Sequence, residues 1–243
     1  MTTDTQAPEQ ARVVLVTGGN RGIGRSIAEA FRRQGDQVIV TYRSGEAPQD
    51  IDAVRCDVSD TESVDAAFSE IEQRWGTVEV VVANAGITQD TLLMRMSDED
   101  FAGVVDTNLG GSFRVAKRAS RGFLKKKFGR IVFISSIVGF TGSPGQVNYA
   151  SSKAGLQGMA RSITRELGSR GVTANVVAPG YIRTDMTAEL SEEVSADYAA
   201  RIPAGRFGEP EEVAAVVRWL ASDGAGYVNG AVIPVDGGFG MGL

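Results

Sequence analysis

Short apolar runs alternate with amphipathic helical stretches along almost the whole chain. Within these runs apolar residues do not alternate with polar ones, which is typical of strands in a parallel sheet covered on both faces. Repeated right-handed strand–helix–strand units build a doubly wound sheet. We therefore predict an α/β fold with a doubly wound parallel sheet. The predicted strands lie at 13–16, 38–40, 54–58, 78–82, 131–134, 172–177 and 231–235.

The predicted helices have recognisable starts. Ser59, with Glu62 three residues later, has the form of a capping box. Another helical region begins near Ser97, with an acidic residue three positions on. Glu209 and Pro210 mark a third start, because proline is favoured in the first turn. The helices are expected from Ile23 to Gly35, from 59 to Gly76, from 97 onward, over 149–167 and from 209 onward.

The length of 243 residues fits one large α/β domain, and no composition break marks a second. We expect a single domain over 13–243 and a flexible N-terminal arm over 1–12, which is polar and lacks the apolar core of a secretory signal. No apolar run reaches the length of a membrane span. The single cysteine, Cys56, fits a reducing compartment, so we expect a cytoplasmic protein.

The composition restricts the possible chemistry more than it restricts the fold. The chain has no histidine, so proton transfer must use Tyr, Lys, Asp or Glu, and histidine–cysteine zinc sites are excluded. We predict no metal site. The net charge is −5 and the basic residues are scattered, which argues against nucleic acid as the main partner.

Glycines gather directly after the first predicted strand, where residues 17–24 read TGGNRGIG before a helix. In an α/β sheet this turn is where a phosphate-bearing ligand binds, because helix N–H groups and the positive end of the helix dipole meet there. A glycine-rich turn alone is also compatible with a plain tight turn. The spacing Gly-x-x-x-Gly-x-Gly is neither the usual dinucleotide pattern nor a phosphate loop with Lys-Ser/Thr.

With its other motifs, the chain resembles the short-chain dehydrogenase/reductases from about residue 12 to the end. Within them it is most similar to bacterial, particularly actinobacterial, 3-oxoacyl-[acyl-carrier-protein] reductases, over 148–155, 175–181 and 235–238. One departure is Ala83, where many relatives have asparagine. The motifs that carry the resemblance are Thr17–Gly24, Asp57-Val58, Asn84-Ala85-Gly86, Asn108, Ser136, Tyr149-x-x-x-Lys153 and Pro179-Gly180.

The resemblance implies a Rossmann-type seven-stranded sheet, a homotetramer and NADPH-dependent reduction of a 3-oxoacyl group. It implies four catalytic residues, Asn108, Ser136, Tyr149 and Lys153. The cofactor residues that it implies are Gly18, Asn20, Arg21, Gly22, Ile23, Gly24, Arg43, Asp57, Val58, Asn84, Ala85, Gly86, Tyr149, Lys153, Pro179, Gly180, Ile182 and Thr184.

Tyr149 and Lys153 are four residues apart and share one face of a helix. Alone, such a pair is typical of a helix surface, but in a chain without histidine it is the natural proton donor. A nearby ammonium is expected to lower the tyrosine pKa. By resemblance, Tyr149 protonates the carbonyl oxygen and Lys153 holds the nicotinamide ribose.

Ser136 is predicted at the carboxyl end of a strand, where its hydroxyl can stabilise a developing alkoxide. Its neighbour Ser135 points the other way along a strand, and the family spacing of twelve residues before Tyr149 selects Ser136. Asn108 is expected in the long middle helix. It is either a buried core amide or, as in the family, the residue that holds a water relaying protons to Lys153.

The segment after the second strand decides the cofactor. Enzymes that prefer NAD usually carry an acid there, but this chain has Arg43, and Arg21 lies inside the glycine loop. Two guanidinium groups suit a 2′-phosphate. We therefore expect NADPH/NADP⁺, the alternative being two solvated surface arginines.

The sequence says less about the substrate. Residues 181–206 are expected to form a lid over it, because loops at the sheet edge carry specificity. The apolar residues of this segment suit an acyl chain or a plain core. They include Tyr181, Met186, Leu190 and Tyr198.

Lys125, Lys126 and Lys127 precede the strand that leads to Ser136, and Arg170 follows the helix that carries Tyr149, so they are expected on one side of the molecule. Such a patch, at Lys127 and Arg170 above all, suits an acidic carrier protein. Basic residues that complement helix C-termini are the alternative.

Three functions follow in order of preference. The first is reduction of 3-oxoacyl-[acyl-carrier-protein] in fatty-acid synthesis. The second is NADPH-dependent reduction of coenzyme-A-linked or free ketones. The third is a non-catalytic dinucleotide-binding protein, which usually lacks the tyrosine or the lysine that this chain keeps.

Overall fold

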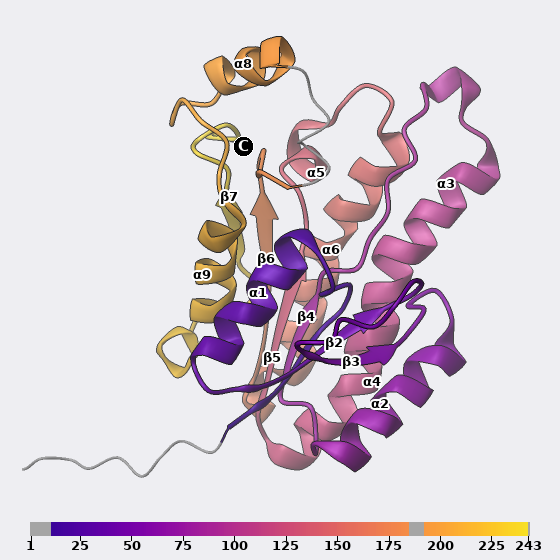
Figure 1. Ribbon diagram of the computed structural model, residues 1–243, viewed down its shortest axis with the longest axis vertical. Helices are drawn as coiled ribbons and strands as arrows, with labels where there is room; N and C mark the ends of the chain where they lie inside the picture. Colours follow the sequence, from indigo (N-terminus) through magenta and orange to yellow (C-terminus); the bar gives the residue numbers. More distant parts are fainter. Residues whose placement is uncertain (1–10, 185–191, 243) are drawn as a thin grey trace, which may run out of the picture.

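The computed structural model describes residues 11–184 and 192–242. Its centre is a parallel sheet of seven strands in the order β3-β2-β1-β4-β5-β6-β7, with helices on both faces (Figure 1). The predicted doubly wound α/β fold is therefore confirmed. Most of the predicted N-terminal arm lies outside the described residues, as do the lid residues Met186 and Leu190.

The strands are buried because both faces of the sheet are covered. Every residue of β1, β4, β5 and β6 is buried, which explains why apolar residues follow one another in these strands instead of alternating with polar ones. The strands are β1 Val13–Val16, β2 Gln37–Tyr42, β3 Asp52–Arg55, β4 Val80–Ala83, β5 Gly129–Ile134, β6 Val172–Pro179 and β7 Val232–Val235.

Two groups of helices enclose this sheet and bury separate apolar cores. α1 and α9 pack together on one face, and α2, α4 and α6 cover the other (Figure 1). The helices are α1 Gly22–Arg33, α2 Thr61–Arg74, α3 Asp98–Val105, α4 Gly111–Lys126, α5 Val138–Thr141, α6 Val147–Leu167, α8 Glu192–Arg201 and α9 Pro210–Leu220. Short helical turns are η1 Leu93–Arg95, η2 Asp106–Gly110, η3 Gly168–Arg170 and η4 Asp223–Ala225. No helix among the described residues is long and apolar enough to span a membrane.

Two predicted helix starts are confirmed by their capping hydrogen bonds. Ser97 caps α3 in a capping box with Asp100. Glu209 and Glu212 form the equivalent box at the start of α9, with Pro210 in the first turn. Both starts combine a cap with acidic residues near the positive end of the helix dipole.

The predicted capping box at Ser59 is wrong. α2 begins one residue later, with Asp60 as the N-cap that accepts the backbone N–H of Glu62 at 3.0 Å. The Ser59 hydroxyl instead donates to the carboxylate of Asp57 at 2.6 Å. The Asp60 carboxylate therefore takes the capping role of acceptor one residue later, and the spacing of Ser59 and Glu62 alone misplaced the helix start.

The third strand lies earlier in the chain than predicted, at Asp52–Arg55 instead of 54–58. Cys56, directly after it, is buried, and burial raises the pKa of its thiol to about 11. The thiol is therefore protonated at neutral pH and unreactive.

The strand order reverses at β1, because β2 and β3 lie on one side of it and β4 to β7 on the other. Ligands of doubly wound sheets bind at the carboxyl edge of the sheet at such a point. The fold thus directs attention to the loops that follow β1, β4, β5 and β6.

Candidate active site

The predicted site residues come together at the carboxyl edge, from elements far apart in sequence. The predicted catalytic residues lie after β5, in η2 and on α6. The predicted cofactor residues are Gly18, Asn20, Arg21, Gly22, Ile23 and Gly24 after β1; Arg43 after β2; Asp57 and Val58 after β3; Asn84, Ala85 and Gly86 after β4; and Pro179, Gly180, Ile182 and Thr184 at the end of β6 and beyond.

Two glycines allow the loop after β1 to lie directly against the end of β4. Gly18 has a φ of +62°, a backbone conformation that favours glycine. A Cβ on Gly24 would lie 2.4 Å from the side-chain nitrogen of Asn84. The start of α1 therefore presents backbone and not side chains to this part of the sheet edge, as close approach to a phosphate requires.

Asn84 and Thr17 hold these two loops together. The Asn84 amide donates to the carbonyl oxygens of Thr17 and Gly18 at 3.0 and 3.1 Å. The Thr17 hydroxyl accepts the backbone N–H groups of Asn84 and Ala85, each at 3.0 Å. Sequence reasoning gave Thr17 no separate role. Its place between an apolar strand and the glycine run was the available signal.

The N-terminus of α1 suits an anion. Its N-cap residue, Arg21, makes no side-chain capping hydrogen bond, and the first turn of the helix carries no acidic residue. The unpaired N–H groups and the positive end of the helix dipole favour a phosphate at this position.

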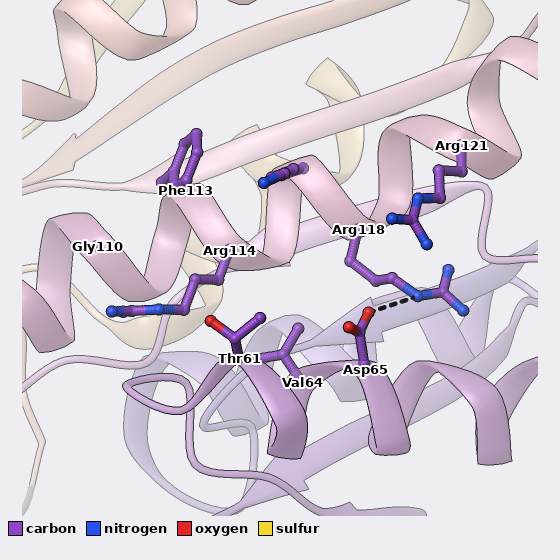
Figure 2. Close-up of a pocket in the computed structure, with 9 residues that line it drawn as sticks. Thr61, Val64, Asp65, Gly110, Phe113, Arg114, Arg118 and Arg121 are labelled. Carbon is purple, nitrogen blue, oxygen red and sulfur yellow. Dashed lines mark ion pairs between the residues drawn. The ribbon is translucent and has the colours of Figure 1, made fainter.

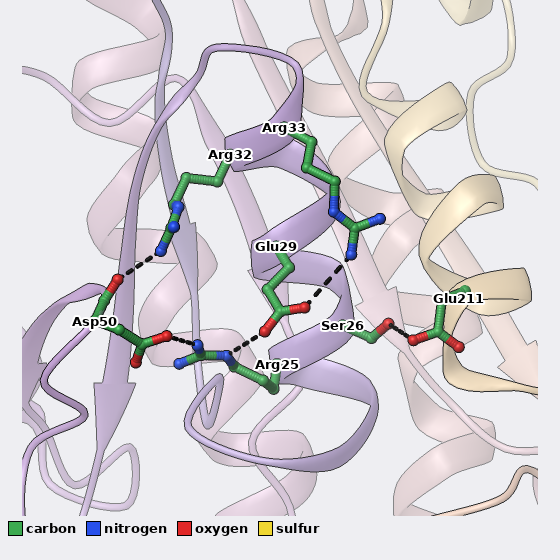
Figure 3. A network of polar contacts seen from close by, with 7 residues as sticks. All are labelled: Arg25, Ser26, Glu29, Arg32, Arg33, Asp50 and Glu211. Carbon is green, nitrogen blue, oxygen red and sulfur yellow. Dashed lines mark hydrogen bonds and ion pairs between the residues drawn. The ribbon is translucent and has the colours of Figure 1, made fainter.

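Further along α1, polar contacts fix the helix to its neighbours (Figure 3). Arg25 donates to Glu29 at 2.8 Å and also pairs with Asp50. Ser26 donates to Glu211 of α9 at 3.0 Å. Arg25 is thus paired with two carboxylates.

Arg21 and Arg43 are both exposed beside the glycine loop. The Gly18 N–H donates to the Thr41 hydroxyl at 3.2 Å, which brings the end of β2, and so Arg43, to this loop. The pKa of Asp57 is lowered, first by the hydrogen bond from Ser59 and further by the charge of Arg43. The charge of Arg43 therefore acts on Asp57, the predicted cofactor residue that follows β3.

The two serines after β5 have different partners. The buried Ser135 donates to the Lys153 carbonyl oxygen at 2.9 Å. Ser136 forms a hydrogen bond with the Tyr149 phenol, and its oxygen accepts the Val138 N–H at 3.2 Å. Ser136, and not Ser135, is the hydroxyl beside Tyr149.

Lys153 is a buried cation on α6, with 5% of its surface exposed. Its Nζ donates to the Ile134 carbonyl oxygen at 2.8 Å and lies 5.6 Å from the centre of the Tyr149 ring. Burial lowers the pKa of Lys153 to about 8. The ammonium and the neutral amine are therefore both accessible near neutral pH.

The expectation that Lys153 lowers the Tyr149 pKa is wrong for this structure. Burial raises that pKa, the hydrogen bond with Ser136 lowers it, and the charge of Asp90 raises it again. The ammonium of Lys153 is directed to a backbone carbonyl, so desolvation of the phenol dominates. Tyr149 is accordingly protonated at neutral pH, the state that a proton donor needs.

Asn108 lies in the π-helical turn between α3 and α4 and is completely buried. Its oxygen accepts the Ile87 N–H at 2.8 Å, and its nitrogen donates to the Ile87 carbonyl oxygen and the Ser152 hydroxyl, both at 3.0 Å. By these contacts it is a core amide. A Cβ on Gly86 would lie 3.0 Å from the Asn108 oxygen and 3.4 Å from Nζ of Lys153, so both polar groups converge there.

The chain after β6 returns over the glycine loop. The Pro179 carbonyl oxygen accepts the Ile137 N–H at 2.9 Å, which holds the end of β6 beside the segment that follows Ser136. A Cβ on Gly22 would lie 3.8 Å from the methyl group of Thr184. The predicted cofactor residues of the two loops therefore face each other.

The described part of the predicted lid is anchored by aromatic rings. Tyr181 stacks on Tyr198 of α8, with ring centres 4.6 Å apart. Its ring centre also lies 5.7 Å from that of Phe207 and 5.4 Å from that of Phe239. The apolar residues of this segment are thus partly core, which was one of the two expected roles.

Lys127 and Arg170 are neighbours, as expected, and both are exposed. A Cβ on Gly171 would lie 2.4 Å from the Lys127 carbonyl oxygen. However, each residue lies two positions before a strand, so both lie at the amino edge of the sheet. Ser136 lies at the opposite edge of the sheet.

A separate cavity of about 350 Å³ lies between α2 and α4 (Figure 2). Arg118 crosses it to Asp65 at 3.1 Å and also pairs with Glu72 at 2.7 Å. None of the predicted catalytic residues lines it, so it is distinct from the site at the sheet edge. Its lining residues are Thr61, Val64, Asp65, Gly110, Phe113, Arg114, Lys117, Arg118 and Arg121.

Comparison with known proteins agrees with this geometry. A family profile described as Enoyl-(Acyl carrier protein) reductase matches residues 18–240, and the motifs occur in the family order. The chain belongs to the short-chain dehydrogenase/reductase family. Among relatives in this family, it is 54% identical over 241 residues to the 3-oxoacyl-[acyl-carrier-protein] reductase MabA of Mycobacterium tuberculosis, covering 99% of this chain and 98% of the relative. It is 45% identical over 240 residues to the 3-oxoacyl-[acyl-carrier-protein] reductase FabG of Escherichia coli, covering 96% and 98%.

Proposed function

We propose that the chain is an NADPH-dependent 3-oxoacyl-[acyl-carrier-protein] reductase of fatty-acid synthesis. The observation that carries the proposal is the contact of the Ser136 hydroxyl with the Tyr149 phenol, with Lys153 one helical turn away and the glycine loop alongside. The relatives MabA and FabG bear this activity in their names. The family profile names an enoyl reductase, which shares the carrier-linked acyl substrate.

A ketone is the group that these residues are suited to reduce. When bound, NADPH supplies a hydride to the carbonyl carbon. The Ser136 hydroxyl donates a hydrogen bond to the carbonyl oxygen and stabilises the negative charge that develops there. The Tyr149 phenol gives its proton to that oxygen, which completes the 3-hydroxyacyl product. Lys153 would hold the nicotinamide ribose.

We further propose NADPH in preference to NADH. The backbone at the start of α1 suits the pyrophosphate, and the exposed Arg21 and Arg43 suit a 2′-phosphate. The glycine loop supports the proposal because it brings backbone, and not side chains, to the start of α1. Asp57 and Val58 would flank the adenine.

Comparison of substrate carriers tests the proposed function. The rate of NADPH oxidation is measured with one 3-oxoacyl group on carrier protein, on coenzyme A and on a small thioester. Faster reduction of the carrier-linked substrate at low concentration is the expected result. Faster reduction of the coenzyme-A-linked substrate would favour a reductase of coenzyme-A-linked or free ketones. Binding of NADPH without any turnover would favour a non-catalytic dinucleotide-binding protein.

The carrier is proposed to dock at Lys127 and Arg170. β5 has six residues and therefore places roughly 20 Å between this patch and Ser136 at the other edge of the sheet. We also propose a homotetramer, as the family resemblance implies. A cytoplasmic location is proposed as well, in keeping with a single buried thiol.

A further inference from the structure

Asn148, the residue before Tyr149, is completely buried and hydrogen-bonded on both sides of its amide. Its oxygen accepts the backbone N–H of Tyr149 at 2.8 Å. Its nitrogen donates to the carbonyl oxygens of Gln89 at 3.0 Å and Asp100 at 3.4 Å. One side chain thus joins the first turn of α6 to the loop after β4 and to α3.

The first turn of α6 depends on this contact because it lacks an ordinary cap. An N-cap side chain usually accepts an N–H group of the first turn. The N-cap residue Gln146 makes no such bond and donates instead to the Asp90 carboxylate at 2.7 Å. Tyr149 is the third residue of α6, so its N–H is one of the groups left unpaired by the helix, and Asn148 satisfies it.

The same loop leads directly to the cofactor residues. It begins after Gly86, and its Thr91 N–H donates to the Gly145 carbonyl oxygen at 2.8 Å, next to the start of α6. Movement of this loop therefore changes the place of Tyr149 relative to Gly86. We propose that Asn148 is a positioning residue, which holds the proton donor Tyr149 in register with the 84–86 loop. The inference rests on the proposed reductase function.

Substitution of Asn148 by aspartate tests the accepting oxygen and the donating nitrogen of the amide separately. Asn148→Asp keeps an acceptor for the Tyr149 N–H, but its second oxygen then faces the carbonyl oxygens of Gln89 and Asp100. Only the protonated acid can donate there. The titratable groups around the turn are Asp90 and Asp100 on one side and Tyr149 and Lys153 on the other. Burial and the two acids favour the protonated form, so lower pH should restore the contact.

Asn175 provides a matched control. It is equally buried, its nitrogen donates to the Val228 carbonyl oxygen at 2.8 Å, and its oxygen accepts the Ala231 N–H at 3.0 Å. These contacts join β6 to the segment before β7, not to α6. Asn175→Asp therefore carries the same chemical change and a comparable loss of stability without touching Tyr149.

The experiment compares Asn148→Asp, Asn148→Ser and Asn175→Asp with the wild type. Turnover of a small 3-oxoacyl thioester is measured at neutral and mildly acidic pH. The rate is divided by the amount of bound NADPH, so that only the folded fraction of each variant is counted. We expect kcat to fall about 10- to 100-fold in both Asn148 variants, with the KM for NADPH nearly unchanged. Asn148→Asp should regain turnover relative to the wild type as pH falls, and Asn175→Asp should keep the wild-type pH profile.

Two results would overturn the positioning role. One is a wild-type kcat and pH profile in both Asn148 variants, and the other is the same change of pH profile in Asn175→Asp. Failure of the proposed function is a different outcome, because then the wild type itself leaves every 3-oxoacyl thioester unreduced.

Discussion

The Lys153 ammonium donates a hydrogen bond of 2.8 Å to the carbonyl oxygen of Ile134, the last residue of β5. This bond fixes a buried cation to the carboxyl end of the sheet, one helical turn from Tyr149. Burial lowers the pKa of Lys153 to about 8, so the charged form is held at a cost in stability. A group that weakens the fold in this way is typical of a functional site.

This cost leads to a prediction for Lys153→Met. The Lys153 pKa is about 8 in the folded chain and has its ordinary value of 10.5 in the unfolded chain. Between these values the unfolded chain binds more protons, so the wild-type free energy of unfolding rises with pH there. Methionine does not titrate, so the wild type should gain stability relative to the variant over this range, and the variant should lose turnover. Thermal unfolding at several pH values measures the difference. The exposed Lys117→Met is the control, and a pH-independent difference would contradict the burial of the charge.

Arg43→Ala tests the cofactor preference. It should raise the KM for NADPH far more than that for NADH, because a charge-assisted hydrogen bond to the 2′-phosphate contributes about 1.5–3 kcal/mol. Steady-state kinetics with each cofactor gives both constants. Equal changes for the two cofactors would mean that Arg43 does not contact the phosphate.

Gly24→Ala tests the close approach of α1 to β4. The added methyl group would lie 2.4 Å from the Asn84 side-chain nitrogen, so Asn84 must give up its bonds to the glycine loop. We expect NADPH affinity to fall roughly tenfold or more, since one or two hydrogen bonds are lost. Gly158→Ala on α6 is the matched control, because nothing lies within 4 Å of its added Cβ. That change should raise stability by about 1 kcal/mol and leave NADPH binding unchanged. Unchanged affinity in Gly24→Ala would show that the loop can move aside.

The carrier patch is tested with Lys127→Glu and Arg170→Glu. Both should slow reduction of carrier-linked substrate at low concentration, because charges at the rim of an interface act mainly on association rate. The loss should shrink as salt rises and the Debye length falls to about 8 Å. A small 3-oxoacyl thioester should react equally with variant and wild type, and Lys117→Glu controls for the change in net charge. An equal loss on both substrates would place the effect in the fold and not in docking.

The fold and the glycine loop follow from local sequence. Buried parallel strands and capped helices produce short-range sequence patterns. The glycines of the loop, such as Gly18, are recognised by their spacing after the first strand. The choice of Ser136 over Ser135 came from the family spacing of twelve residues before Tyr149 and not from local sequence alone. The amino-edge position of Lys127 and Arg170 was available from local sequence, because each lies two positions before a strand.

The contacts that place Tyr149 do not follow from local sequence. Asn148 binds carbonyl oxygens 48 and 59 residues away, and these meet it only after the sheet has formed. The Tyr149 pKa likewise depends on burial by distant elements and on Asp90, so the local Tyr–Lys spacing predicted the wrong direction. The sequence pattern therefore predicts the helices and strands but not the side-chain contacts between loops.

Tyr149→Phe provides the most direct test of the account. Single-turnover oxidation of bound NADPH is followed after mixing wild type or variant with a 3-oxoacyl carrier thioester. The account predicts unchanged NADPH affinity and a hydride-transfer rate at least about 100-fold lower in the variant, because only the proton donor has been removed. A variant that oxidises NADPH at the wild-type rate would contradict the role of Tyr149 as the proton donor.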